Sequence, residues 1–332
     1  MGVRESVLGG SGVAARDSSA PSYYNPALLS EKSKNYFNVS AATFSYYRNQ
    51  SDSGNFSSTK INPNYISTVQ AFDSFVQEFS LTNEFSISSR FLTSTFHQNR
   101  TTSLNIDLYQ FVYAFAFPDF PFGFKVGVKA LDTDSQVSQV TEEGSVKSGA
   151  SLNTSKLEGA LFLGVGSVFQ LAKHYRLGVQ YEMAGIRIYQ KFENDGFVYY
   201  YDQNNNTFYQ SRFVDTPQEK SFYGQNLNIG HSFGWEDHEF LTDSKFVEVS
   251  KDAYNYIQTF GYNYIASDKW QFMCGYARQF KSSSQLLEDS SDYYSSGFSW
   301  VKNTMRSSVG AYYVRQKQDK TVGITFGSEF KY

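Results

Sequence analysis

The chain has 332 residues, with 29 Lys or Arg and 32 Asp or Glu, so its formal net charge is −3. This near balance argues against a nucleic-acid partner, because proteins that bind nucleic acids usually carry a basic patch or stripe. The aromatic share is unusual at 18%, with 31 Phe and 26 Tyr. Such a composition favours strands with one apolar and one wet face, as in the aromatic-girdled barrels of outer membranes.

Several chemical functions are excluded by what the sequence lacks. Cys274 is the single cysteine, so an intramolecular disulfide and a cysteine-based zinc site are both ruled out. The four histidines show no metal-binding spacing, and no Lys follows the glycines at 9–12 as a phosphate-binding loop requires. We therefore expect no enzyme activity, no cofactor and no metal. If the protein is exported, we expect its signal peptide to lie outside this numbering.

Residues 1–33 do not alternate between apolar and polar and form the first predicted unit. Asn25 can cap one short helix by accepting backbone N–H bonds, and Pro26 suits the first helical position. Irregular backbone cannot face lipid, so it must lie against protein or in a watery lumen. We expect residues 1–33 to be a hatch inside a barrel formed by residues 34–332. The expected anchors are inward asparagines such as Asn226, Asn228, Asn255 and Asn263.

Period-two alternation recurs from residue 36 to the C-terminus and predicts amphipathic strands. The clearest stretch is 321–332, where apolar residues such as Phe326 and Phe330 alternate with polar ones. One face is rich in Tyr, Phe, Leu and Val, and the other in Gly, Asn and Gln, as expected for lipid outside and a wet, crowded lumen inside. The predicted strands lie near 36–49, 63–73, 76–92, 103–118, 121–137, 155–171, 174–191, 197–213, 219–233, 252–266, 268–281, 292–301, 304–316 and 320–332.

This pattern predicts an all-β, transmembrane antiparallel β-barrel with fourteen strands. The count falls to twelve if 197–213 and a neighbour are not strands. Glu193-Asn194-Asp195-Gly196 is typical of a tight hairpin turn. Residues 138–154 and 234–251 are expected to be long polar loops on the outer side, because such barrels have short periplasmic turns and longer outer loops.

The N-terminal motifs are similar to those of a known family. Gly10-x-Gly12-Val13-Ala14, Asp17-Ser18-Ser19-Ala20 and Asn25-Pro26-Ala27-Leu28, placed before amphipathic strands, resemble the start of the long-chain fatty-acid transporter (FadL-like) family of bacterial outer-membrane proteins. The resemblance implies a fourteen-stranded barrel, a hatch that plugs the lumen, and uptake of hydrophobic molecules by diffusion. The hatch residues that it implies are Gly10, Gly12, Asp17, Asn25, Pro26 and Ala27.

The candidate ligand contacts are inward residues of the barrel. Lys125 and Lys129 could pair with a carboxylate head group, and Phe162, Ile257 and Met273 could line a greasy pocket. The segment 234–251 supplies a candidate outer capture surface, because an exposed apolar cluster suits a binding surface. Its candidate residues are Trp235, Phe240, Leu241 and Phe246.

The leading hypothesis is therefore a channel through which a fatty-acid-like molecule diffuses past the hatch, with lipid around the barrel. The alternative is a barrel of the PorV-like branch, which binds or shuttles a protein partner and transports nothing. An open, nonselective porin is the third option, and the predicted plug argues against it.

Overall fold

The structure is a computed structural model that describes residues 2–48, 55–58, 62–94, 98–214, 223–250, 253–282, 290–316 and 319–332. The helical segments of this part of the chain are α1 (Val3–Val7), α2 (Pro21–Tyr24) and the 3-10 helix η1 (Pro26–Glu31). The strands are β1 (Tyr36–Arg48), β2 (Asn55–Ser58), β3 (Asn62–Ala71), β4 (Val76–Ser94), β5 (Gln98–Ala116), β6 (Phe122–Glu143), β7 (Val146–Ala172), β8 (Tyr175–Glu182), β9 (Ile186–Asp202), β10 (Thr207–Val214), β11 (Asn226–Trp235), β12 (His238–Ser250), β13 (Ala253–Ser267), β14 (Trp270–Ser282), β15 (Ser291–Lys302), β16 (Met305–Gln316) and β17 (Asp319–Lys331).

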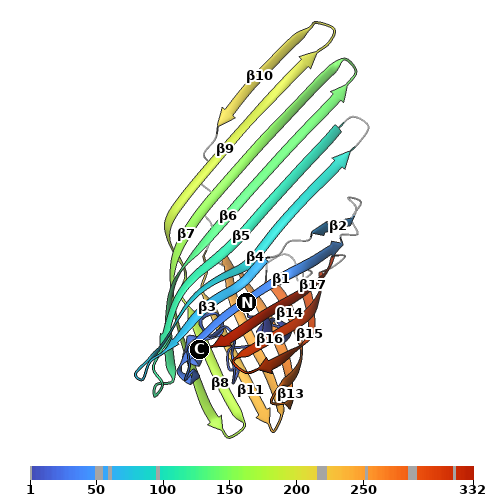
Figure 1. Cartoon of the computed structure of the whole chain (residues 1–332). Coiled ribbons are helices and arrows are strands. Elements are labelled where there is room, and N and C mark those ends of the chain that lie inside the picture. The colour runs from blue at the N-terminus through green and yellow to red at the C-terminus, as the bar shows by residue number, and fades with distance from the viewer. Residues whose placement is uncertain are drawn as a thin grey trace.

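Fourteen antiparallel strands form a closed barrel (Figure 1). β1 pairs with β3 on one side and with β17 on the other, from Tyr36 opposite Lys331 to Arg48 opposite Lys320. Closure leaves no free edge at the level of the ring, so the backbone groups there are paired without water. The ring consists of β1, β3, β4, β5, β6, β7, β8, β11, β12, β13, β14, β15, β16 and β17. None of the helical segments in the described residues is long and apolar enough to cross a membrane.

The two faces of the ring divide as the alternation predicts. On β5, Gln110 and Val112 are 2% and 5% exposed, whereas Phe111 between them is 53% exposed. The same division places Phe272 and Cys274 on the outer face of β14 and buries Met273 between them. The outer face is therefore a belt of large apolar rings, suited to contact with lipid.

The predicted strand count is correct, but one predicted member is wrong and one ring strand was not predicted. The segment 197–213 is not a ring strand, and 238–250, expected to be loop, is the ring strand β12. The two errors cancel in the count. The loops expected at 138–154 and 234–251 are hairpins with turns at Gly144–Ser145 and Glu236–Asp237. Their polar residues belong to strands. Composition alone does not distinguish a polar strand from a polar loop.

The predicted turn at Glu193–Gly196 is also wrong. These residues lie within β9, which runs to Asp202 and pairs with β10 through a turn at 203–206, where Asn206 has a φ of 49°. The predicted strand 174–191 is divided at residues 183–185 into β8 and β9. β8 and β9 pair with successive parts of β7, so the chain leaves the ring at this break.

A tall sheet, which we call the wall, rises from one side of the ring. β6 and β7 have 22 and 27 residues, against 12 for β16. Their upper parts extend beyond the ring together with β4, β5, β9 and β10 (Figure 1). The opposite end of the ring carries the C-terminus and short turns, and we call it the C-terminal rim. These turns lie at 72–75, 117–121, 173–174, 236–237, 268–269 and 303–304.

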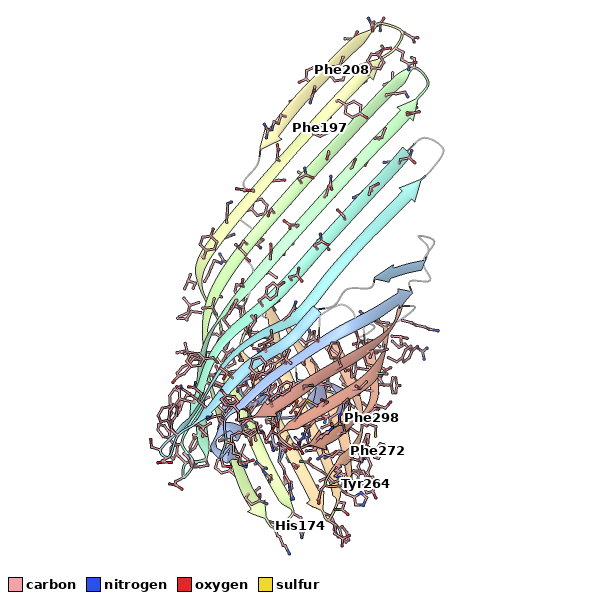
Figure 2. The ribbon with its side chains drawn as sticks, in the orientation of Figure 1. His174, Phe197, Phe208, Tyr264, Phe272 and Phe298 are labelled. Carbon is pink, nitrogen blue, oxygen red and sulfur yellow. The ribbon has the colours of Figure 1, made fainter. Side chains whose placement is uncertain are left out.

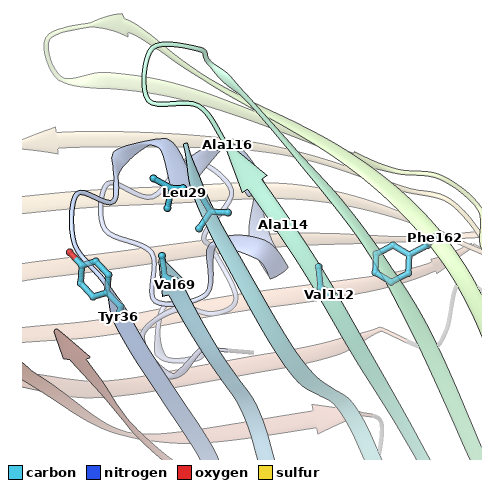
Figure 3. Packing of buried hydrophobic residues seen from close by; sticks show 8 residues of the cluster. Leu29, Tyr36, Val69, Val112, Ala114, Ala116 and Phe162 are labelled. Atoms are coloured by element: carbon cyan, nitrogen blue, oxygen red, sulfur yellow. The ribbon is translucent and has the colours of Figure 1, made fainter. Parts of the chain in front are cut away.

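The N-terminal segment packs against the inner faces of strands on both sides of the ring. α1 contacts β14, β15, β16 and β17, and η1 contacts β4, β5, β6 and β7. Leu29 joins a buried cluster with ring residues that include Val69, Val112 and Phe162 (Figure 3). A single helix was expected here, and the structure has three short ones, with α1 burying all five of its residues.

Candidate lumenal site

The N-terminal segment is fixed to β12 by charged groups. The carboxylate of Asp243 accepts hydrogen bonds from the backbone N–H groups of Gly12 (2.7 Å) and Val13 (3.1 Å). Arg4 forms a buried ion pair with Glu239 at 2.7 Å. Removing a carboxylate from such a pair would leave an uncompensated buried partner, so these contacts fix the position of the segment.

Asn25 connects the segment to the other side of the ring. Its side-chain oxygen accepts from Ala27 N at 3.1 Å, which confirms the predicted cap. Its amide donates to the carbonyl oxygens of Val13 (2.9 Å) and Ser167 on β7 (3.0 Å). Asn25 is fully buried, so a single side chain caps η1, joins two parts of the segment and attaches them to the wall side.

A second group of ion pairs lies nearer the C-terminal rim. Asp17 pairs with Arg306 of β16 and with Lys32. Glu31 pairs with Arg176 of β8. The asparagines proposed as anchors do not appear among the described hydrogen bonds to the segment. Asn226 donates instead to Glu182, and the side-chain amide of Asn228 contacts that of Gln180, both on the neighbouring strand β8.

Glycines on the inner face of the ring let the backbone of the N-terminal segment approach the ring strands closely. A Cβ on Gly275 of β14 would lie 2.0 Å from the backbone nitrogen of Gly9. A Cβ on Gly123 of β6 would lie 2.3 Å from the carbonyl carbon of Pro26. Gly9 and Gly10 have φ values of 70° and 85°, a conformation that favours glycine. The inward glycines of the alternating pattern therefore make room for the segment.

Above the segment lies a lumenal cavity of about 640 Å³. Gly9, Gly10 and Tyr23 of the N-terminal segment contribute to its lining. Its cationic lining residues are Lys129 and Lys245, and the apolar ones include Leu108, Val247, Ile257 and Val314. Lys245 Nζ donates to the carbonyl oxygen of Gly10 at 2.6 Å. A lining of this kind suits an apolar ligand with one polar end.

Lys125, Lys129 and Phe162 form one cluster in the structure. Both ammonium groups pair with Glu182 of β8, with 2.8 Å between Lys125 Nζ and Glu182 Oε2. They lie 5.6 and 5.0 Å from the centre of the Phe162 ring, which is 2% exposed. Only Lys129 of this cluster lines the cavity.

The remaining candidate ligand contacts are separated. Ile257 lines the cavity on the β13 side. Met273 faces inward but is buried in a cluster with Val3, Val7 and Leu8, so it packs against the N-terminal segment. The five candidates therefore comprise two cavity residues, two residues of the lysine cluster behind it, and one packing residue.

The predicted capture surface is not one surface. Trp235 lies at the turn to β12 on the C-terminal rim, at the opposite end from the wall. Leu241 is buried and faces inward, while Phe240 and Phe246 are exposed on the outer face of β12. The segment was expected to be a loop because it is rich in charged residues. The structure shows that Glu239, Asp243 and Lys245 are on the inward face of a strand, while Glu236 and Asp237 form its turn.

Sequence reasoning missed the charged residues that hold the N-terminal segment. Glu239, Leu241, Asp243 and Lys245 occupy alternate positions of β12 and all face the lumen. The signal was present, because the charges at 239, 243 and 245 are separated by even numbers of residues and so fall on one face of a strand, as expected for a polar face that points into a packed lumen.

Several solved structures with this fold are FadL-type barrels. The toluene transporter TodX of Pseudomonas putida matches 100% of this chain and 97% of its own length with a TM-score of 0.68 and 11% identity. The toluene transporter TbuX of Ralstonia pickettii matches over 100% and 98% with a TM-score of 0.68 and 14% identity. A FadL homologue of Pseudomonas aeruginosa matches over 99% and 98% with a TM-score of 0.66 and 12% identity. No family model and no curated protein sequence matches the chain. The fold is thus that of an outer-membrane barrel of the FadL type.

Proposed function

We propose that the protein is an outer-membrane channel through which a fatty-acid-like molecule diffuses past residues 1–33, which act as a hatch. The observation that carries this proposal is the cavity whose lining includes the N-terminal segment itself. A ligand in that cavity touches the N-terminal segment, which lies between the cavity and the C-terminal rim. The named activities of TodX and TbuX, which are toluene transporters, support a hydrophobic cargo.

The polar end of the ligand is assigned from the cavity lining. Lys245 presents an ammonium group whose bond goes to the neutral carbonyl of Gly10, and Lys129 lies across the same cavity. A carboxylate could accept charge-assisted hydrogen bonds from these groups, while its chain lies against Leu108, Ile257 and Val314. This arrangement favours an acid over its neutral ester.

Binding of a fluorescent fatty acid and of its methyl ester to the purified barrel tests the head-group assignment. Lys245→Met should weaken binding of the acid and leave binding of the ester unchanged. Only the acid has a carboxylate that pairs with the ammonium group of Lys245. Lys147→Met, on an exposed pair with Glu142, is the matched control. Equal weakening of acid and ester would show that Lys245 acts only by holding Gly10.

Deleting residues 2–33 tests the hatch. The deletion removes part of the lining of the cavity and should raise ion conductance in planar bilayers. Unchanged conductance of a correctly folded deletion variant would contradict the hatch. Raised conductance without binding of any hydrophobic probe to the intact protein would contradict transport.

One observation favours the alternative of a protein partner. In the part of the chain that the structure describes, β10 pairs only with β9, and Phe208 and Tyr209 on it are 62% and 63% exposed. An apolar edge strand of this kind can accept a strand from another protein. Co-purification of a stoichiometric protein, lost when β9 and β10 are removed, would favour this alternative.

A further inference from the structure

Part of the C-terminal rim carries exposed rings that are all phenylalanine. The β3–β4 turn is Phe72-Asp73-Ser74-Phe75, and the β5–β6 turn is Phe117-Pro118-Asp119-Phe120-Pro121. Phe72 and Phe120 are 48% and 47% exposed. With the nearby side chains on β6 and β7 they form what we call the phenylalanine rim. Its members are Phe72, Phe75, Phe117, Phe120, Phe122, Phe169 and Leu171.

The other side of the same rim has a different composition. We call it the amphipathic rim, and its members are Tyr175, Trp235, His238, Tyr264, Trp270 and Trp300. It includes all three tryptophans of the chain. Its rings carry polar atoms that form hydrogen bonds. The Tyr175 hydroxyl lies 2.8 Å from His231 Nδ1, and His238 Nδ1 lies 2.8 Å from the Tyr262 hydroxyl. Figure 2 shows His174 and Tyr264 at this lower edge.

Two turns of the amphipathic rim carry more charge than those of the phenylalanine rim. The two turns of the phenylalanine rim carry one charged residue each, Asp73 and Asp119. The β11–β12 and β13–β14 turns carry two each, Glu236 with Asp237 and Asp268 with Lys269, whereas the β15–β16 turn, Asn303-Thr304, carries none. Amphipathic rings and charged turns are favoured at the level of lipid head groups, whereas plain phenylalanine is favoured in hydrocarbon.

We propose that the barrel is inclined in the membrane, so that the phenylalanine rim lies among lipid acyl chains while the amphipathic rim lies at the head groups. The middles of the two rims, at β5 and β14, lie on opposite sides of the ring, because these strands are seven positions apart among fourteen. The rims adjoin at the β7–β8 turn, between Leu171 and Tyr175. A difference in depth between them is therefore an inclination of the whole barrel toward β5.

Lipid is the occupant because the phenylalanine rim continues the outer belt without a break. The distance between ring centres is 5.5 Å for Phe115 and Phe124, 4.9 Å for Phe120 and Phe122, and 6.2 Å for Phe122 and Phe169. Phe124 belongs to the exposed belt of the ring, together with Phe79, Phe111 and Leu163. A surface that is continuous with the lipid-facing belt and has the same chemistry is covered by the same acyl chains.

Quenching of tryptophan fluorescence by brominated phospholipids tests the proposal in reconstituted vesicles. The wild-type protein reports on the amphipathic rim alone, because all three tryptophans are there. A background with W235F, W270F and W300F then receives F120W, or in a separate variant F72W, each verified as folded by its migration on a detergent gel before and after boiling.

We expect F120W and F72W to be quenched most by lipid brominated near the chain end, and to emit at shorter wavelength than the wild type. The native tryptophans should be quenched most by lipid brominated near the head group. Identical depth profiles would overturn the inclination. Absence of quenching at F120W and F72W by either lipid would overturn lipid as the occupant. If the Trp-free background does not fold, F120W added to the wild type supplies the same comparison by difference.

Discussion

Glu182 is the shared counter-ion of two lysines inside the barrel. Its carboxylate pairs with Lys125 and Lys129 and also accepts from Asn226. Glu182→Gln should therefore lower the stability of the folded barrel by about 3–5 kcal/mol, the usual range when one partner of a buried pair is removed. The measurement is the urea concentration at which the heat-modifiable gel band is lost.

Lys129→Met is the matched control for Glu182→Gln. It keeps the 2.8 Å pair between Lys125 and Glu182, so the loss should be much smaller. Equal losses in the two variants would contradict a role of Glu182 as the shared counter-ion.

Asn25 shows how one polar side chain fixes an irregular segment. Asn25→Ala removes the cap on Ala27 and both amide bonds, and the cap alone is worth about 0.5–2 kcal/mol. We expect faster proteolysis of the N-terminal segment and altered passage of a hydrophobic probe, with the barrel still folded. Asn25→Asp keeps the capping oxygen and loses the amide donors. An effect as large as that of Ala would assign the role to the amide.

At the scale of elements, the close approach of the N-terminal segment to β14 depends on glycine. Gly275→Ala would place a methyl group 2.0 Å from Gly9 N, so the segment has to move. Overpacking of this kind costs about 1–3 kcal/mol. We expect Gly275→Ala to raise basal conductance in planar bilayers. Gly159→Ala, whose Cβ would meet an ordinary 3.5 Å contact, should leave it unchanged. Equal conductance of the two variants would contradict the packing argument.

Most ring strands could be predicted because their outer faces are apolar at every second residue. β14 and β17 follow this rule over most of their length, with exceptions such as Arg278 and Ser328, and their predicted bounds lie within two residues of those observed. β12 could not be found in this way, because its outer face mixes Phe240 and Phe246 with Thr242 and Ser244. The wall strands extend beyond the apolar belt, so hydrophobic alternation stops before their hydrogen-bonded ladder does.

The candidate site was predicted in part, for a related reason. Alternation correctly placed Lys125, Lys129 and Ile257 on the inner face, because facing direction follows from the two-residue period. The pairing of strands decides which inner residues meet, and the sequence of one strand carries little information about its neighbours' register. The contact of Glu182 with both lysines, and that of Lys245 with Gly10, could therefore not be derived.

At the scale of the whole molecule, the C-terminal residues close the ring. Phe330 lies opposite Phe37 on β1, and Tyr332 N donates to Asn35 O at 3.2 Å. Removing Phe330 to Tyr332 should sharply reduce the heat-modifiable form in the outer membrane of cells, as judged by gels of membrane fractions. Lys147→Met, on the exposed pair with Glu142, is a control that leaves both ends of the chain intact. Normal assembly of the C-terminal truncation would contradict the role of this end.

The seam between β1 and β17 also joins the two ends of the chain. Tyr36 and Lys331 are neighbours in space but come from almost opposite ends of the chain. The N-terminal segment contacts β12 through Arg4 and β16 through Asp17, and both strands are synthesised long after it. The contacts of the segment with β12 and β16 can form only when these strands are in place, so the final position of the first residues depends on the last strands of the ring.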